Sequence, residues 1–285
     1  MASKPYVYEV DLKVILLSKI DILGLFISTI KKLTTFEPVM RLFNLIGSYI
    51  LLLGKVFAKP EKKMIYYKLT IKEIEKLGLN SIGIVAIISA FMGAVITIQT
   101  AYNTENPFLP SYLIGLAARD SILLEFSSTI VGLILAGKVG SNIASEIGTM
   151  RVTQQIDALE VMGVNSASYL ILPKIIATIL FNPFLTMLSI VVGIIGGWSV
   201  GVFTGVVTTQ EYINGIQYAF IPYYITYALI KTVVFAFLIT TISAFQGYNV
   251  SGGSLEVGQA STRAVVASSV AILLFNLILT QLLLS

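Results

Sequence analysis

Residues 175–210 read IIATILFNPFLTMLSIVVGIIGGWSVGVFTGVVTTQ, and this stretch, which contains no charged side chain, decides the fold class. A helix rises about 1.5 Å per residue, so roughly 20 apolar residues cross a bilayer. The stretch is longer than one ideal span and contains Pro183. We predict a long transmembrane helix over about 175–205 that is kinked or tilted.

Four further apolar stretches satisfy the same length requirement. Two others near the N-terminus do not, because Val14 to Ile30 is interrupted by charges and Leu42 to Gly54 is short. Such segments are typical of helices that lie at the membrane surface. The predicted fold is therefore an all-α membrane protein with about five transmembrane helices and N-terminal interfacial helices. The four further spans cover about 79–102, 121–137, 224–248 and 264–284.

The composition excludes several classes of protein. Of the 285 residues, 56% are hydrophobic and 12% are charged, and the mean hydropathy is +0.87, which is too apolar for a soluble domain. The chain contains no Cys and no His, so disulfides, thiol chemistry, histidine metal sites and catalytic triads are impossible. We expect no catalytic residue, no metal and no cofactor. The net charge of +4 lies mostly near the N-terminus, which suits a lipid-facing cytoplasmic flank better than nucleic-acid binding.

The distribution of Lys and Arg predicts the topology. The stretch 55–76 is rich in Lys, the loop 138–174 carries Lys138, Arg151 and Lys174, and the loop 211–223 carries neither residue type. Positively charged loops remain on the cytoplasmic side of a membrane. We therefore predict that the N-terminus and the loops 138–174 and 249–263 are cytoplasmic and that the C-terminus lies outside.

A match to the start of a nucleotide-binding P-loop is misleading. Residues 132–138 read GLILAGK, but Val139 stands where the loop needs a hydroxyl for Mg²⁺, and the preceding residues are typical of a membrane helix. We interpret Gly137 and Gly140 as a helix end and Lys138 as an anchor at the membrane surface. The chain is therefore predicted to have no ATP site of its own and to be no enzyme.

Glycines recur at every fourth position of the third predicted span. This spacing places them along one helix face, where small residues allow two membrane helices to approach closely. The sequence leaves open whether the face packs within the chain or forms the seam of a dimer. The four residues are Gly193, Gly197, Gly201 and Gly205.

Residues 146–162 have the periodicity of a short amphipathic helix. One face is apolar, and the segment is too polar to span a bilayer. A helix of this kind between two spans favours docking on a cytoplasmic partner, and the alternative is a helix that lies passively on the membrane. The apolar face comprises Val152, Ile156, Leu159 and Met162, and the polar residues are Arg151, Gln154, Asp157 and Glu160.

Glu125 and Lys231 lie within predicted spans, where ionisable groups are costly and usually functional. The predicted topology places them at similar depth near the outer boundary, so they are able to pair. We interpret them as a polar patch in a substrate cavity. The alternatives are a structural ion pair or a Lys whose ammonium reaches the membrane surface.

Two longer runs carry a family resemblance. Residues 136–163, AGKVGSNIASEIGTMRVTQQIDALEVMG, and residues 252–266, GGSLEVGQASTRAVV, resemble the signatures of MlaE-type permeases. The resemblance covers roughly residues 37–285, and residues 1–36 look like an N-terminal extension. It implies a homodimeric permease of an ABC transporter in the bacterial inner membrane, with a periplasmic C-terminus, that moves phospholipids between the inner and outer membranes.

The resemblance also implies partners. A separate cytoplasmic ABC ATPase would hydrolyse ATP, a periplasmic MCE-domain protein would receive or deliver the lipid, and some systems add a small STAS-domain subunit. The segment 146–162 matches the coupling helix of the family, which contacts the ATPase. The residues implied in this contact are Glu146, Arg151, Gln154, Gln155, Asp157 and Glu160.

The implied lipid site comprises Leu124, Glu125 and Lys231. Glu125 matches the acidic residue of the R-E-L-x-P-type motif that the family has at its lipid cavity, and Lys231 resembles an embedded Lys in the fourth span. In this chain Leu124 and Ser128 replace the Arg and the Pro of that motif. The carboxylate is kept and its cationic neighbour is lost, so contacts with the headgroup are expected to differ.

Three other functions compete with this one. A secondary transporter or channel predicts more than one buried charge pair, and a membrane-bound enzyme needs a cluster of catalytic side chains, for which the sequence offers little. A membrane assembly subunit that does not transport is the third alternative.

Overall fold

The computed structural model describes residues 37–58, 63–104 and 109–284. The regular structure in these ranges is helical, and no strand occurs among them. The chain divides between Leu51 and Leu52 into two units. The described part of the first unit, residues 37–51, belongs to helix α2 (Glu37–Phe57), which covers the predicted interfacial segment Leu42 to Gly54. The other predicted interfacial segment, Val14 to Ile30, lies outside the described residues.

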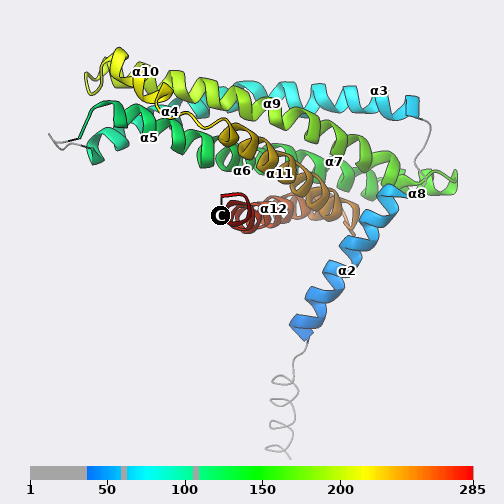
Figure 1. The fold of residues 1–285 in the computed structure, drawn as a ribbon. Helices are drawn as coiled ribbons and strands as arrows, with labels where there is room; N and C mark the ends of the chain where they lie inside the picture. Colours follow the sequence, from blue (N-terminus) through cyan, green and yellow to red (C-terminus); the bar gives the residue numbers. More distant parts are fainter. Residues whose placement is uncertain (1–36, 59–62, 105–108, 285) are drawn as a thin grey trace, which may run out of the picture. The chain divides into compact units, whose positions relative to one another are not determined.

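Among the described residues of the second unit, five helical segments are long and apolar enough to cross a membrane, which confirms the predicted fold class (Figure 1). The first two segments are continuous and contain α-helical and π-helical stretches, with one 3₁₀ turn in the first segment, and the last three are single α-helices. The first segment contains α3 (Lys63–Glu73), η1 (Ile74–Gly78), η2 (Leu79–Ser81) and α4 (Ile82–Asn103). The second contains α5 (Tyr112–Ser121), η3 (Ile122–Ile130), α6 (Val131–Leu135), η4 (Ala136–Gly140) and α7 (Ser141–Val152). The others are α9 (Ser166–Phe203), α11 (Tyr223–Tyr248) and α12 (Ser254–Leu284).

The helices are longer than the predicted spans. The first helical segment begins at Met64, before the predicted start near residue 79, the second continues to Val152, past the predicted end near 137, and the last begins at Ser254, before the predicted start near 264. The second segment has 41 residues, or about 60 Å of helix, which is twice the roughly 30 Å of a hydrocarbon core. Long helices of this kind extend beyond the membrane and carry charged residues there.

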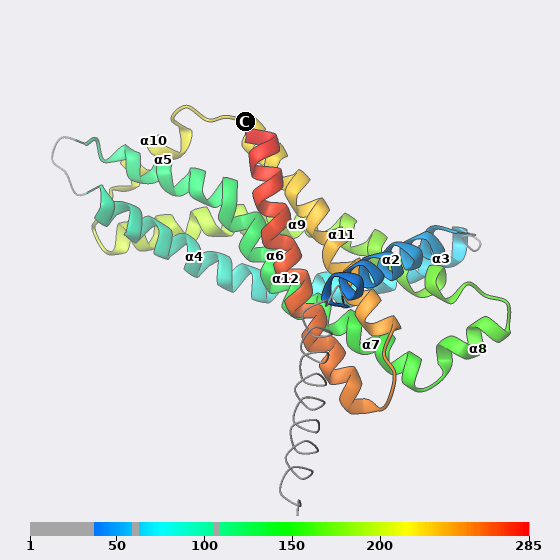
Figure 2. The ribbon, with the colours of Figure 1, turned by 90° about the horizontal axis from the view of Figure 1, so that it is seen from below.

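Two short helices mark the opposite ends of the second unit (Figures 1 and 2). Helix α8 (Gln155–Val161) joins α7 to α9, and helix α10 (Thr209–Gln217) follows α9 and precedes α11. We call these the α8 end and the α10 end. Because the spans alternate in direction, α7 and α11 finish at the α8 end, whereas α4 and α12 finish at the α10 end.

Helices α4 and α9 pack through glycine, backbone against backbone. A Cβ added to Gly93 would overlap the carbonyl of Gly193, and one added to Gly197 would overlap the hydroxyls of Thr97 and Tyr212. Gly201 faces Thr97 and Val207 in the same way. The structure therefore places these three glycines of the predicted face against neighbours in the same chain.

Gly205, the fourth glycine of the predicted face, has a different role. It lies beyond the end of α9 with a φ of +71°, a left-handed conformation that glycine adopts without strain, and a Cβ there would meet no atom. The series of glycines at every fourth position therefore ends with a residue that terminates the helix, and Gly205 does not extend the packing face.

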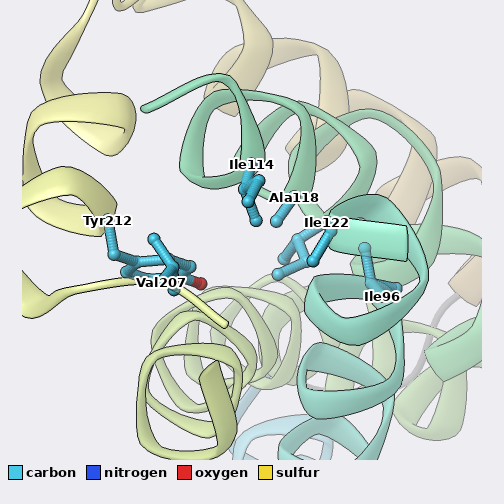
Figure 3. Packing of buried hydrophobic residues seen from close by; sticks show 7 residues of the cluster. Ile96, Ile114, Ala118, Ile122, Val207 and Tyr212 are labelled. Atoms are coloured by element: carbon cyan, nitrogen blue, oxygen red, sulfur yellow. The ribbon is translucent and has the colours of Figure 1, made fainter. Parts of the chain in front are cut away.

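A hydrophobic cluster fixes the α10 end (Figure 3). It joins α4, α5, η3 and α10, and its member Tyr212 donates from its hydroxyl to the carbonyl of Ile194 at 3.3 Å. Helices α5 and α10 also approach closely at Gly115 and Gly215, where an added Cβ would overlap the opposite backbone. These contacts hold η3, the segment that carries Glu125, at a defined depth. The buried members are Ile96, Ala101, Ile114, Ala118, Ile122, Val207 and Tyr212.

Candidate functional site

Glu125 lies in η3, a nine-residue π-helical segment of the second span. π-Helical turns are rare, are wider than α-helical ones and occur frequently at functional sites. Here the carbonyl of Leu124, one residue before Glu125, accepts a hydrogen bond from the Nζ of Lys231 at 3.1 Å. Backbone and side chain of neighbouring η3 residues therefore bind the same ammonium group.

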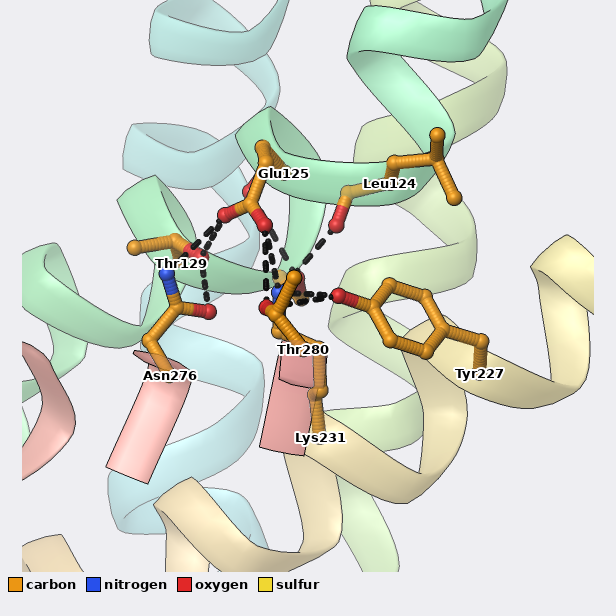
Figure 4. A network of polar contacts seen from close by, with 8 residues as sticks. Leu124, Glu125, Thr129, Tyr227, Lys231, Asn276 and Thr280 are labelled. Atoms are coloured by element: carbon orange, nitrogen blue, oxygen red, sulfur yellow. Dashed lines mark hydrogen bonds and ion pairs between the residues drawn. The ribbon is translucent and has the colours of Figure 1, made fainter. Parts of the chain in front are cut away.

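Lys231 of α11 is fully enclosed, with a side-chain exposure of 0%. Its Nζ lies 3.1 Å from Oε1 of Glu125 and donates to the hydroxyl of Tyr227 at 3.0 Å (Figure 4). The ammonium also lies 4.7 Å from the centre of the Tyr227 ring. Three oxygen acceptors within hydrogen-bond distance stabilise the ammonium group in a low-dielectric interior, where an unpaired charge would be costly.

The carboxylate of Glu125 has further partners on two helices (Figure 4). Its Oε2 accepts from the hydroxyl of Thr129 at 3.0 Å and from the amide of Asn276 at 3.0 Å, and its Oε1 accepts from the hydroxyl of Thr280 at 3.3 Å. In contrast to Lys231, Glu125 has 41% of its side chain exposed. The carboxylate is thus the accessible member of the pair.

An open groove of about 710 Å³ lies beside this carboxylate. Its wall combines apolar side chains with two carboxylates and one hydroxyl, so a polar group and a hydrocarbon chain would each find complementary surface. The groove brings together Leu124 and Glu125 of the predicted site, whereas Lys231 lies behind them and does not line it. The lining residues are Leu116, Ala117, Asp120, Ser121, Leu124, Glu125 and Phe126.

The predicted single helix over residues 146–162 does not occur. Helix α7 ends at Val152, Gln154 has a left-handed φ of +59°, and α8 begins at Gln155. The predicted apolar face is consequently divided, with Ile156 fully buried and Met162 exposed. This break has no signal in the sequence, because Gln154 is neither Gly nor Pro.

Residues of α8 are braced at two points. Asp157 accepts from Arg151 at 2.6 Å, and the Oε1 of Glu160 accepts from Ser166 at 2.9 Å and from Tyr248 at 3.0 Å. Because the two hydroxyls donate to its charged form, the pKa of Glu160 is lowered from its ordinary value. These bonds connect α8 to the first turn of α9 and the last turn of α11. Gln154 and Gln155 are exposed at the same end.

Glu146 lies apart from these residues, in a cluster of charges between three spans. The Nζ of Lys174 in α9 lies 2.7 Å from Glu73 and 2.6 Å from Glu146, and Lys76 lies 3.0 Å from Glu146. The side chain of Lys174 is only 4% exposed. Sequence reasoning used Lys174 and Lys76 only to predict topology, although a Lys flanked by apolar residues is itself a signal of a buried partner.

Arg119 is a second buried charge that sequence reasoning missed. Its guanidinium is ion-paired with Asp120 at 2.8 Å and donates to the carbonyls of Ile216 and Tyr218 at 2.7 and 2.8 Å. The guanidinium also lies 5.7 Å from the ring centre of Phe220. Arg119 thereby fixes the segment after α10 against α5, next to the groove that Asp120 lines.

The predicted helix end at Gly137 and Gly140 was wrong, because both lie inside the second helical segment, where α7 follows η4 directly. Gly137 is followed by Lys138, which donates to the carbonyl of Asn80. Both are helical residues without a preceding strand, which a P-loop requires. No cluster of three or more potential metal-ligating side chains occurs among the described residues.

The fold and the site together define a multi-pass α-helical membrane protein with ionisable groups held inside its spans, as is typical of proteins that move polar substrates through a membrane. Comparison with known proteins supports this class. The family model described as Permease MlaE matches residues 70–282, and on this evidence the chain belongs to the MlaE family of ABC transporter permeases.

Individual relatives match over most of the chain. A probable ABC transporter permease protein of Rickettsia bellii is 35% identical over 243 residues, which are 85% of this chain and 93% of the relative. The intermembrane phospholipid transport system permease protein MlaE of Haemophilus influenzae is 32% identical over 246 residues, 86% of this chain and 94% of that protein. The chloroplastic protein trigalactosyldiacylglycerol 1 of Arabidopsis thaliana is 32% identical over 228 residues, 80% of this chain and 65% of that protein.

Proposed function

We propose that the chain is the permease subunit that moves phospholipids between the inner and outer membranes, driven by a separate cytoplasmic ABC ATPase. The observation that carries the proposal is the half-exposed carboxylate of Glu125, held by a buried Lys231 beside an open groove. The family membership and the printed name of the Haemophilus influenzae relative support the same substrate class.

In this proposal Glu125 is the residue that contacts the lipid headgroup. Lys231 is enclosed and already has three acceptors, so it acts on the lipid through Glu125 by fixing the charge and position of that carboxylate. Leu124 and Phe126 in the groove wall would contact the glycerol and the first carbons of the acyl chains. Asp120, the other carboxylate of the groove, is paired with Arg119.

We further propose that the α8 end is cytoplasmic and contacts the ATPase. Val161 and Met162 expose large apolar side chains at the tip of α8, next to the charged Asp157. An exposed apolar tip rimmed by charges fits a protein partner. Gln154 and Gln155 lie at the rim of this surface, whereas Arg151 and Glu160 brace α8 and Glu146 acts inside the spans.

The remaining partners follow from the orientation. With the α8 end in the cytoplasm, the α10 end and the C-terminus of α12 lie on the periplasmic side of the inner membrane, where an MCE-domain protein would receive or deliver the lipid. Only 11% of the most apolar stretch of α12 is buried within one chain. Helix α12 therefore has a face available to a second copy in a homodimer.

The test is lipid analysis of the transporter purified from its native membrane. We expect phospholipid to copurify with the wild-type complex, and Glu125→Gln to reduce the amount retained, whereas Glu211→Gln, a change in the capping box of α10 that does not line the groove, should retain the wild-type amount. The absence of copurifying phospholipid, or equal retention by the two variants, would contradict the proposal.

A further inference from the structure

The apolar packing of α12 stops halfway along the helix. Its buried residues are spaced as one helix face, and they end at Ile272. Among residues 273–284, all of which the structure describes, every side chain is exposed or only partly buried. Within one chain, the half of α12 at the α10 end therefore lacks the packing that anchors its other half. The buried residues are Val257, Ala260, Ala264, Ser268 and Ile272.

Polar contacts take the place of this packing, and they too lie on one helix face. Asn276 contacts Glu125 at 3.0 Å and the hydroxyl of Thr129 at 3.1 Å. Thr280 contacts Glu125 at 3.3 Å and the hydroxyl of Tyr227 at 2.9 Å. One turn further, the carbonyl of Leu283 accepts from the hydroxyl of Tyr223 at 3.0 Å.

Such contacts hold a helix weakly and exchange easily. A hydrogen bond between membrane helices contributes little net stability, because either partner finds another when the helices separate. Two of the donors on α12, the amide of Asn276 and the hydroxyl of Thr280, bind the same carboxylate of Glu125. A lipid headgroup with its own N–H or O–H donors offers that carboxylate equivalent bonds.

We propose that Asn276 and Thr280 are positioning residues that hold both Glu125 and the last three turns of α12, and that headgroups with N–H or O–H donors replace them at the carboxylate. The inference rests on the proposed function, in which the groove beside Glu125 takes a phospholipid. It specifies the substrate class. Ethanolamine and glycerol headgroups have N–H or O–H donors that replace those of Asn276 and Thr280 at the carboxylate of Glu125. Choline cannot replace them, because its quaternary ammonium has no N–H.

The first test compares headgroups on the full chain reconstituted in nanodiscs. Phosphatidylethanolamine and phosphatidylcholine with identical acyl chains are supplied, and exchange of bound lipid is followed by mass spectrometry. We expect ethanolamine lipid to exchange roughly threefold to tenfold faster, the difference that one or two interhelical hydrogen bonds produce. Thr280→Val, which removes the hydroxyl, should narrow this ratio, and Thr280→Ser, which keeps it, should preserve it.

The second test fixes α12 covalently, which is practicable because the chain has no native Cys. A disulfide between Thr129→Cys and Asn276→Cys would join the half of α12 at the α10 end to η3. As a matched control, Ser243→Cys with Ser268→Cys joins the packed half of α12 to α11, where the two hydroxyls lie 3.4 Å apart. Oxidation should slow lipid exchange in the first pair and leave the second unchanged, and a reducing agent should restore the first.

Three results would overturn the inference: equal rates for the two headgroups, equal effects of Thr280→Val and Thr280→Ser, or failure of the 129–276 pair to cross-link or to slow exchange once cross-linked. If phospholipid binds and exchanges in the wild type, only this inference fails. If neither the wild type nor the 243–268 pair binds phospholipid, the proposed function fails with it.

Discussion

Gly93 of α4 lies directly against the backbone carbonyl of Gly193 in α9, so that α4 has no room for a side chain at this point. The contact determines how closely the first and third spans approach. Backbone atoms cannot move aside as a flexible side chain can, so an added methyl group must separate the helices.

We predict that Gly93→Ala lowers the stability of the chain by about 1–3 kcal/mol, the range for overpacking a tight interior. Gly83→Ala in the same helix is the matched control, because its Cβ would meet no atom and Ala is the better helix former. Thermal unfolding in detergent should show a lower Tm for the first variant alone. Equal Tm values would mean that α4 and α9 are not in this contact.

The isolated chain should hydrolyse no ATP. Lys138, the residue that would bind phosphate in a P-loop, donates to the carbonyl of Asn80, and Val139 provides no hydroxyl for Mg²⁺. Purified protein should show only background turnover, and Lys138→Ala should leave the nucleotide affinity of the complete transporter unchanged. Robust turnover by the chain alone would refute the prediction.

Substituting Val161 by Asp should weaken copurification of the ATPase several-fold, because a charge placed in an apolar contact must be desolvated. Phe203→Asp is a control at the opposite end, since both side chains are 89% exposed. The Val161 variant should keep the wild-type Tm. Equal losses of ATPase from both variants, or from neither, would remove the α8 tip from the contact.

Glu125 and Lys231 should behave as one unit in a double-mutant cycle on lipid transport. Lys231→Met leaves the carboxylate without its cation, and Glu125→Gln leaves the ammonium with neutral acceptors only, so each single change should reduce transport. The double variant should be little worse than the worse single one. Strictly additive losses would show that the two side chains contribute independently.

Acid should loosen α8. The pKa of Glu160 is lowered because Ser166 and Tyr248 donate to its carboxylate. The stability that these two hydrogen bonds give to α8 is therefore present above the unfolded-state pKa of about 4.3, and it is lost as the pH falls through the lower folded-state pKa. Relative to the intrinsic exchange rate at each pH, the hydrogen-exchange protection of residues 155–165 should fall over this range. In Glu160→Gln this loss of protection should be absent, and its persistence would assign the effect to another group.

The sequence was sufficient to predict five spans, because a run of about 20 apolar residues rarely occurs outside a membrane helix. The helices continue past the predicted span ends where charges pair inside them. Lys76 and Lys174 were interpreted as loop residues and Glu146 as part of an amphipathic helix, but the fold brings the three together in one charge cluster. A single charge therefore does not by itself mark the end of a helix.

The candidate site was predictable in part. Glu125 and Lys231 stand out because ionisable groups are rare in apolar runs. Asn276, Thr280 and Tyr227 do not stand out, since neutral polar residues are common in membrane helices and their spacing along the chain does not reveal which helix they face. Their roles required the three-dimensional structure.

The charge cluster around Lys174 affects how force passes through the protein. Moving α9 away from both α3 and α7 would leave the buried ammonium of Lys174 without its two carboxylates, at a cost of several kcal/mol. We therefore expect the parts of the first three spans near the α8 end to move together as one rigid body when a force acts on α8. Bending would then concentrate farther along the second span, at the wide π-helical turns of η4 and η3, so that a push on the proposed ATPase contact would be delivered close to Glu125.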